Sequence, residues 1–327
     1  MGLTLAHPIV SGASPLTADL DLVLRLEDAG AAAIVMHSLF EEQILKGAMR
    51  RPRQRRGSRT FAGAVGSGSI PAYARFADEY LEHLLRVKTR VGVPVLASLN
   101  GTTAEGWLHY ARALEQAGAD ALELNFYNVA SSPAESGTAI EQRLIDIVAV
   151  VTGTVRIPVA VKLLPFYSSV PHLAERLERI GARGLVLFNS LYLPDIDPET
   201  GGALTDVHLS GSSELVPRLH AIAAVARFSG LSLALSGGVR DGVDVVKAVM
   251  AGADVVQVTS ALLRHGPSHL THLRSAFESW LSQHGYESSA QIRKSAGIVR
   301  DRRLPSADRT DYLSLLQSWD PDSYHSH

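Results

Sequence analysis

The chain has 327 residues, of which 46% are hydrophobic and 20% charged, and its formal net charge is −2. This balance gives no reason to expect nucleic acid or an anionic membrane as a partner. No apolar run reaches the ~18 residues of a bilayer-spanning helix. The chain has no cysteine, which excludes disulfides, Cys-ligated iron–sulfur clusters and a cysteine nucleophile; no metal site is expected. The first residues, Met1–His7, lack the features of a signal peptide, so a cytoplasmic enzyme is expected.

Short apolar runs and helical patterns alternate along the chain. In chain order the predicted strands centre on Ile9-Val10, Ile34–Met36, Val95–Leu99, Leu122–Leu124, Val159–Val161, Leu185–Phe188, Leu233–Leu235 and Val255–Val258. Helical patterns cover roughly residues 17–29, 75–90, 104–117, 139–152, 172–180, 214–228, 242–251 and 268–284. Eight such units favour a closed TIM (β/α)8 barrel, with a doubly wound open α/β sheet as the alternative. Residues 1–327 are expected to form one domain, whose tail, 288–327, packs on the barrel or is partly disordered.

A glycine between a helical pattern and an apolar run occurs four times. The copies are Ala29-Gly30-Ala31, Ala117-Gly118-Ala119, Ile180-Gly181-Ala182 and Ala251-Gly252-Ala253. Glycine readily adopts the left-handed conformation that ends a helix. The apolar run that follows is typical of a strand buried on both faces of a parallel sheet. The repeats therefore predict βα units.

Three longer insertions, 40–70, 126–138 and 191–213, each follow a predicted strand. They are therefore expected at the C-terminal mouth of the barrel, where such loops form a substrate pocket or lid. The first insertion contains six arginines within residues 50–59. Such a run is typical of a solvated loop tip, and contact with an anionic partner or substrate is the alternative.

Every predicted strand ends in hydrogen-bonding side chains. In chain order these are Ser11, His37-Ser38, Ser98 with Asn100, Asn125, Lys162, Asn189-Ser190, Ser236 and Thr259-Ser260. The C-terminal ends of barrel strands converge on the active site. These side chains are therefore expected to share one site.

The last two strand ends predict a phosphate site. Gly237 and Gly238 let backbone N–H groups approach a phosphate closely, and a helix starting near Asp241 presents its positive end. Thr259 and Ser260 follow the next strand, and in phosphate-binding barrels the loops after strands seven and eight form this site together. The residues therefore predict a phosphate or a phosphate-bearing cofactor.

Lys162 ends the fifth predicted strand, and a lysine in a barrel mouth has two common roles. It can form a Schiff base with a carbonyl substrate. Alternatively, it can place a fixed positive charge beside a flavin, whose pyrimidine edge becomes negative on reduction. Asn125 and Asn189 flank it, and their amides suit a flat ring with alternating N–H and C=O groups.

Taken together and in order, these residues resemble the dihydroorotate dehydrogenases, nearest the class 1 type and in particular the bacterial dihydroorotate dehydrogenase-like proteins. The resemblance covers roughly residues 5–285. Its marks are Val10–Pro15, Ala119–Asn125, Val161–Leu163, Asn189-Ser190, Gly237-Gly238 and Thr259–Ala261. Two further stretches, His37–Glu42 and Pro194–Asp197, are similar to the dihydroorotate dehydrogenase-like group.

The resemblance implies an FMN-dependent oxidoreductase of pyrimidine biosynthesis that oxidises dihydroorotate, or a related dihydropyrimidine-like ring, at a CH–CH bond. By position, the residues around the flavin ring would be Ser11, Gly12, Ser38, Ser98, Asn125, Lys162 and Asn189. Gly237, Gly238, Thr259 and Ser260 would hold the phosphate. Asn100, Asn128 and Ser190 are expected to contact the substrate.

The sequence departs from the class 1 pattern where that family has its catalytic cysteine. Here the stretch reads Asn125-Phe126-Tyr127-Asn128, and His37 stands where class 1 enzymes have a lysine. The family's substrate-binding asparagine is replaced near Gly66-Ser67-Gly68. Oxidation of dihydroorotate needs a base. Tyr127, His37 and Ser131 are the candidates, and His37 has the ordinary pKa closest to neutral.

The resemblance also bears on the partners of the protein, and two alternative functions stay open beside it. The first strand begins near residue 8, without the helical extension by which class 2 enzymes reach membrane quinones, so a membrane acceptor is not expected. A separate redox partner protein is the alternative acceptor, and the resemblance implies a homodimer. Two other functions stay open: a Schiff-base lyase built on Lys162, and a non-catalytic FMN-binding protein.

Overall fold

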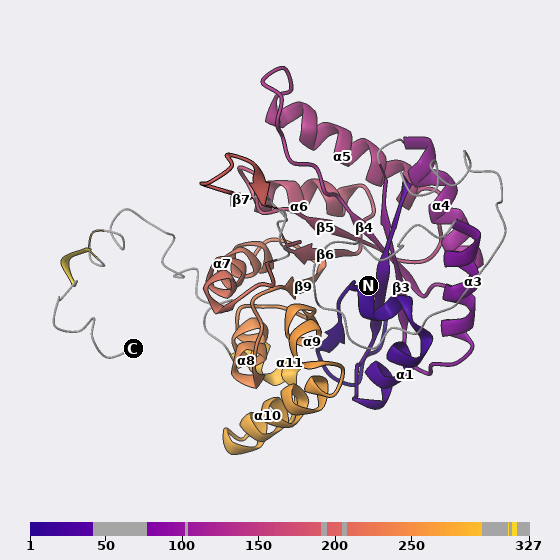
Figure 1. Ribbon diagram of the computed structural model, residues 1–327. Helices are drawn as coiled ribbons and strands as arrows, with labels where there is room; N and C mark the ends of the chain where they lie inside the picture. The colour runs from indigo at the N-terminus through magenta and orange to yellow at the C-terminus, as the bar shows by residue number, and fades with distance from the viewer. Residues whose placement is uncertain are drawn as a thin grey trace.

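The computed structural model describes residues 1–41, 77–101, 104–190, 195–204, 208–295, 313 and 316–318. Eight parallel strands close into a barrel in the order β1, β10, β9, β6, β5, β4, β3, β2 (Figure 1). The strands are β1 (Ile9–Ser11), β2 (Ile34–Phe40), β3 (Val95–Asn100), β4 (Ala121–Asn125), β5 (Val159–Leu163), β6 (Gly184–Leu187), β9 (Ser232–Ser236) and β10 (Val255–Val258). All eight lie where the apolar runs predicted them. The closure confirms the TIM barrel and rules out the open sheet.

Helices surround the barrel on its outer side (Figure 1). They are α1 (Leu20–Asp28), α3 (Ala77–Lys88), α4 (Ala104–Gln116), α5 (Gly137–Thr152), α6 (Val170–Arg179), α7 (Leu215–Ala226), α8 (Gly242–Met250) and α10 (His269–Gln283). Two 3-10 turns, Pro15–Ala18 and Ser212–Glu214, precede α1 and α7. Each helix agrees with a predicted helical pattern to within a few residues. No helix in the described ranges is both long and apolar enough to cross a lipid bilayer.

The four repeated glycines end helices in the left-handed conformation. Their φ angles are +92° at Gly30, +91° at Gly118, +95° at Gly181 and +111° at Gly252. A side chain at such a φ is strained. The repeat therefore fixes where each helix stops and turns the chain directly into β2, β4, β6 or β10.

Successive side chains along each strand point alternately out toward the helices and into the barrel, which divides the core into two parts. One set of strand side chains, including Leu122, Val161 and Leu185, belongs to the large apolar cluster shared with the helices. The other set points into the barrel. Its lower members, such as Val10 and Val186, are apolar and pack against the N-terminal segment, including Met1. A cavity of about 260 Å³ lies among them. The polar members occupy the opposite, C-terminal end.

Four elements were not predicted as such. The insertion after β6 contains a hairpin, β7 (Asp195–Ile196) with β8 (Ala203–Leu204). A short helix, α9 (Ser260–His265), follows β10 directly. The start of the tail forms α11 (Ser289–Ser295), where Ile292 is fully buried and Arg293 pairs with Asp254. That the whole chain forms one domain stays a prediction, and most of the tail lies outside the described residues.

Candidate active site

Three polar side chains meet inside the barrel, just below its mouth. Lys162, at the end of β5, donates from Nζ to Glu123 Oε1 at 3.3 Å and to Gln257 Oε1 at 3.2 Å. Gln257 in turn donates from Nε2 to Glu123 Oε2 at 2.6 Å. All three are buried. The triangle gives the Lys162 ammonium one fixed position with a single carboxylate as its counter-charge.

A second chain of hydrogen bonds crosses the mouth. Asn189 donates to Asn125 Oδ1 at 2.7 Å, and Asn125 donates to Ser38 Oγ at 3.3 Å. The hydroxyls of Ser38 and Ser98 lie 2.8 Å apart. The chain therefore brings together four residues that the sequence assigned to a flavin ring, from β2, β3 and β4 and from the loop after β6.

Two buried polar atoms near this chain have no hydrogen-bond partner among the described residues. They are Ser11 Oγ, at the end of β1, and Asn100 Nδ2, at the end of β3. Buried polar groups are nearly always satisfied. Together with Lys162, these atoms fit a bound ring that carries its own acceptors and donors, as the isoalloxazine of FMN does.

The loops after β9 and β10 meet as the sequence predicted. Gly237 and Gly238 have φ angles of +95° and +80°. The Gly238 N–H donates to Ser210 Oγ at 3.0 Å, and Ser210 in turn donates to Ser260 Oγ at 2.8 Å. A Cβ on Gly12 would lie 2.4 Å from Thr259 Oγ1, so the end of β1 closes on the end of β10. Backbone N–H and hydroxyl groups thus gather in a cradle of the kind that binds phosphate.

The predicted helix start is less open than expected. The Asp241 carboxylate caps α8 by accepting from Val243 N at 2.9 Å and Asp244 N at 3.0 Å. These N–H groups of the first turn are therefore occupied by the chain's own carboxylate. A phosphate here would rely on the glycine loop and on the hydroxyls of Thr259 and Ser260, and the Gly238 N–H would have to exchange its bond to Ser210 Oγ for one to the phosphate.

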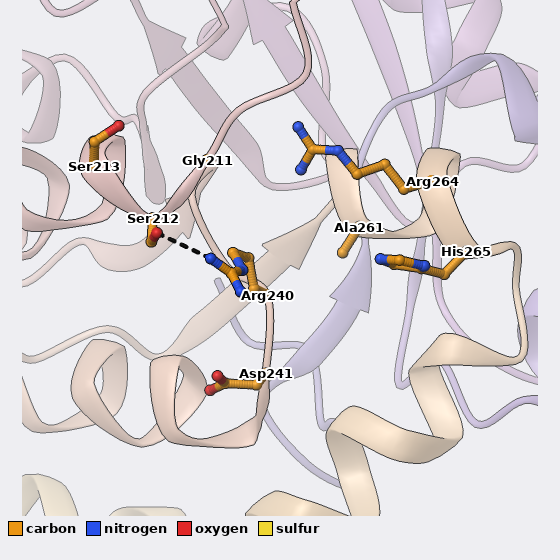
Figure 2. A pocket seen from close by; sticks show the side chains of 8 residues that line it. All are labelled: Gly211, Ser212, Ser213, Arg240, Asp241, Ala261, Arg264 and His265. Atoms are coloured by element: carbon orange, nitrogen blue, oxygen red, sulfur yellow. Dashed lines mark hydrogen bonds between the residues drawn. The ribbon is translucent and has the colours of Figure 1, made fainter. Parts of the chain in front are cut away.

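A cavity of about 570 Å³ lies beside these loops. Figure 2 shows its lining, in which Arg240 reaches toward Ser212 and hydrogen-bonds it at 3.2 Å. Arg264, from α9, holds the Leu209 and Ser210 carbonyls at 2.5 and 2.8 Å. Its guanidinium therefore fixes the loop that carries Ser210.

His37 lies apart from the mouth. Its ring packs edge-on to Tyr80 at 4.9 Å and lies 6.2 Å from His83, and both of these residues belong to α3. Burial, and to a lesser extent the charge of His83, lower the pKa of His37 to about 4. His37, one of the three candidate bases, therefore packs against helix α3. Its neighbour Ser38 belongs to the hydrogen-bond chain that crosses the mouth.

Other polar residues that the sequence assigned to the substrate or to the base lie in the loops after β4 and β6. Tyr127 is half-buried, whereas Asn128 and Ser131 are exposed. Ser190 is half-buried, and its N–H donates to Asn189 Oδ1 at 3.0 Å. The Arg-rich run 50–59 and Gly66–Gly68 lie outside the described residues.

Three residues that the sequence did not single out take part in this arrangement: Glu123, Gln257 and Ser210. Glu123 and Gln257 each interrupt an apolar strand, as Leu122-Glu123-Leu124 and Val256-Gln257-Val258. A charged or amide side chain inside a barrel strand is expensive unless it is paired. The cost of burying such a side chain is the sequence signal from which Glu123 and Gln257 could have been predicted as site residues.

Comparisons with known proteins agree with this arrangement. A family model described as "Dihydroorotate dehydrogenase" matches residues 61–281. The chain is similar to the "Dihydroorotate dehydrogenase B (NAD(+)), catalytic subunit" of Methanosarcina mazei, at 30% identity over 308 residues, which cover 92% of this chain and 94% of that protein. It is also similar to the protein of the same name from Thermoplasma acidophilum, at 27% identity over 295 residues, which cover 88% and 94%.

Proposed function

Because the chain belongs to the dihydroorotate dehydrogenase family and is an oxidoreductase acting on a CH–CH bond, we propose that it oxidises dihydroorotate, or a closely related dihydropyrimidine ring, with FMN bound at the mouth of the barrel. The observation that carries this proposal is the buried triangle of Lys162, Glu123 and Gln257. It fixes a positive charge where the strand ends converge. The reaction belongs to pyrimidine biosynthesis.

The residues present fit FMN at both of its ends. Ser11, Ser38, Ser98, Asn125 and Asn189 would surround the ring, and two polar atoms, Ser11 Oγ and Asn100 Nδ2, are buried without a partner in the described part of the chain. The loops with Gly237, Gly238, Thr259 and Ser260 would hold the phosphate. Gly12 is required because a Cβ there would meet Thr259.

The reaction removes two hydrogens from adjacent carbons of the substrate. Bound FMN supplies the acceptor for one hydrogen together with both electrons. Lys162 stabilises the negative charge that this transfer creates, since its ammonium is held in place before the reaction. The second hydrogen leaves as a proton, which a side chain of this protein must accept.

Tyr127 is the proton acceptor in this proposal: its own hydroxyl proton passes to solvent, and the phenolate oxygen then takes the proton from the substrate carbon. It stands in the loop after β4, where class 1 enzymes have their catalytic cysteine, and its side chain is half-buried. His37 fits the role less well because its ring packs on Tyr80 and His83. Ser131 is exposed, so nothing shields a reacting proton from solvent there.

A Schiff-base lyase built on Lys162 is the weaker reading of the same site. A Schiff base requires a free amine that can attack a carbonyl. The Lys162 nitrogen instead forms an ion pair with Glu123 and a hydrogen bond with Gln257. These contacts favour a fixed charge over a nucleophile.

The electron acceptor is proposed from the relatives. Both relatives described above are named catalytic subunits of an NAD(+) enzyme. Electrons therefore pass from this chain to NAD⁺ through a separate redox partner subunit. The purified chain alone is expected to lose its flavin colour with substrate but to leave NAD⁺ unreduced. A homodimer and a cytoplasmic location stay predictions of the sequence.

The test is anaerobic titration of the FMN-loaded protein with dihydroorotate, dihydrouracil and NAD(P)H. Bleaching of the flavin absorbance by dihydroorotate is the expected result. Failure to bind FMN overturns the cofactor assignment. Bound FMN that no dihydropyrimidine bleaches overturns the reaction and favours a non-catalytic flavin-binding role. Trapping of a carbonyl compound on Lys162 by borohydride favours the lyase.

A further inference from the structure

Arg218 is a buried arginine of α7 that contacts the glycine loop. It lies one turn into α7, and only 8% of it is exposed. Its Nε donates to the carbonyl of Ser236 at 2.7 Å, and its Nη1 donates to the carbonyl of Glu214 at 2.7 Å. The guanidinium is therefore clamped to the residue that leads directly into Gly237-Gly238.

The guanidinium also touches the loop itself. A Cβ on Gly237 would lie 2.8 Å from Arg218 Nε and 3.1 Å from Arg218 Nη2. The first residue of α7, Leu215, approaches Gly238 in the same way, with its backbone nitrogen 2.7 Å from where a Cβ would be. Both glycines are thus needed to let α7 pack closely, and this packing brings a cation against the loop.

This cation lacks a matching anion. Among the ion pairs of the described residues none involves Arg218. The Glu214 carboxylate accepts instead from the Gly211 N–H at 3.1 Å. Burial lowers the pKa of Arg218, and Glu214 raises it, but an arginine stays protonated at neutral pH. A buried charge with only carbonyl partners is costly.

We infer that Arg218 is the counter-charge for the cofactor's phosphate, acting through the Gly237-Gly238 loop as a positioning residue. This inference rests on the proposed function. A phosphate monoester carries about −1.5 to −2 charge at neutral pH. In a buried setting a fixed positive charge attracts it more strongly than an exposed one does. Arg240 and Arg264 lie near the same loops but are exposed, so solvent screens their charges.

The experiment compares two ligands that differ only in the phosphate. Apo-protein is titrated with FMN and with riboflavin, and the ratio of the two affinities isolates the phosphate's contribution. In Arg218→Gln the FMN affinity is expected to fall by at least about 10-fold, with riboflavin affinity unchanged. Arg218→Met fills the same space without a polar group and is expected to give the same loss. Arg218→Lys is expected to retain most of the ratio.

Arg86→Gln is the control, because it removes one exposed arginine charge of α3 and should leave the ratio unchanged. Equal losses of FMN and riboflavin binding in a folded Arg218→Gln or Arg218→Met variant overturn the inference and assign Arg218 a purely structural role. An unchanged ratio in either variant also overturns it. If the unaltered protein binds neither flavin, the proposed function itself fails.

Discussion

The Lys162 ammonium lies 3.3 Å from the Glu123 carboxylate inside the barrel, and the two side chains are only 5% and 0% exposed. Gln257 bonds to both of them and so closes a three-membered network. A buried ion pair of this kind is weak evidence for stability, because desolvation offsets much of the attraction. Its consequence for the chemistry is clearer, because the pair holds the Lys162 ammonium in one position just below the mouth of the barrel. The two members of the pair can be tested separately.

Replacing Lys162 by methionine is expected to slow flavin reduction by dihydroorotate by about 10²- to 10³-fold, the usual effect of removing one preorganised electrostatic group. The midpoint potential of bound FMN should fall, because the reduced, more negative ring loses its nearby positive charge. Stopped-flow absorbance and potentiometry measure the two effects. Lys247→Met, which removes an exposed lysine of α8, is the control. An unchanged reduction rate in Lys162→Met would refute the electrostatic role.

Replacing Glu123 by glutamine leaves Lys162 buried without a counter-charge. Breaking a buried pair in this way is expected to lower the free energy of unfolding by about 3 kcal/mol or more. Glu175→Gln is the matched control, since it breaks an i,i+4 pair with Arg179 whose side chains are 51% and 67% exposed; its expected cost is at most about 0.5 kcal/mol. Urea unfolding measures both. Equal losses in the two variants would contradict the buried pairing.

Much of the fold follows from local signals in the sequence. The strands were predictable because strands buried on both faces read as continuous apolar runs, and Gly30, Gly118, Gly181 and Gly252 marked the helix ends. The β7–β8 hairpin was missed because its strands have two residues each and carry no periodic pattern. The helix α9 was missed because Ser260 reads equally well as the end of β10.

The site was predictable where strands end and less so elsewhere. Ser38, Ser98 and Asn125 were named from their positions, and the structure joins them by hydrogen bonds. Lys162 was named in the same way and is the neighbour of Asn125 on the next strand. His37 was named a candidate base from its position near the end of β2, but the register of β2 against β3 shifts between Val35 and Ser38. Such a shift exchanges the faces of the residues after it. Ser210 and Arg218 come from a long loop and a helix interior, and only tertiary packing brings them to the glycine loop.

The Gly238 position is expected to reject any side chain. Gly238→Ala would place a Cβ 2.7 Å from the Leu215 backbone nitrogen at a φ of +80°. A backbone atom cannot move aside as a side chain can, so α7 or the loop must shift, and FMN occupancy should fall severely. Gly266→Ala has the same φ of +80° but open space around it, and should cost about 1 kcal/mol of stability without loss of FMN. Flavin content after reconstitution measures the difference. Full occupancy in Gly238→Ala would argue against the loop as the phosphate cradle.

Tyr127→Phe removes the hydroxyl proposed as the proton acceptor while keeping the ring. Flavin reduction by dihydroorotate is expected to slow by about 10²- to 10⁴-fold, the range for losing a general base. FMN binding and the flavin potential should be unchanged, which separates this role from that of Lys162. Ser131→Ala, in the same loop, is the control and should retain the parent rate. A normal rate in Tyr127→Phe together with a slow Ser131→Ala would transfer the role to Ser131.

His37 of β2 and the neighbouring His83 of α3 predict an acid-sensitive fold. Burial lowers the pKa of His37 to about 4, and burial also lowers the pKa of His83, whose Nε2 lies 2.8 Å from the Thr17 carbonyl oxygen. An unfolded histidine titrates near pH 6.5. Between these values the unfolded chain binds a proton that the folded chain does not. The contribution of His37 is therefore fully present above about pH 6.5 and is lost as the pH falls toward about 4, by up to about 3 kcal/mol.

His37→Gln removes this titration while keeping a polar side chain, and the backbone carbonyl that accepts from the Tyr80 hydroxyl at 2.8 Å is retained. Its free energy of unfolding should depend less on pH than that of the parent between neutral pH and about pH 4.5. His172→Gln, which replaces an exposed histidine of α6, should leave the parent slope unchanged. Because His83 remains in His37→Gln, a residual slope is expected, and the double variant should reduce it further. Parallel curves of unfolding free energy against pH for the parent and His37→Gln would show that protonation of His37 does not destabilise the fold.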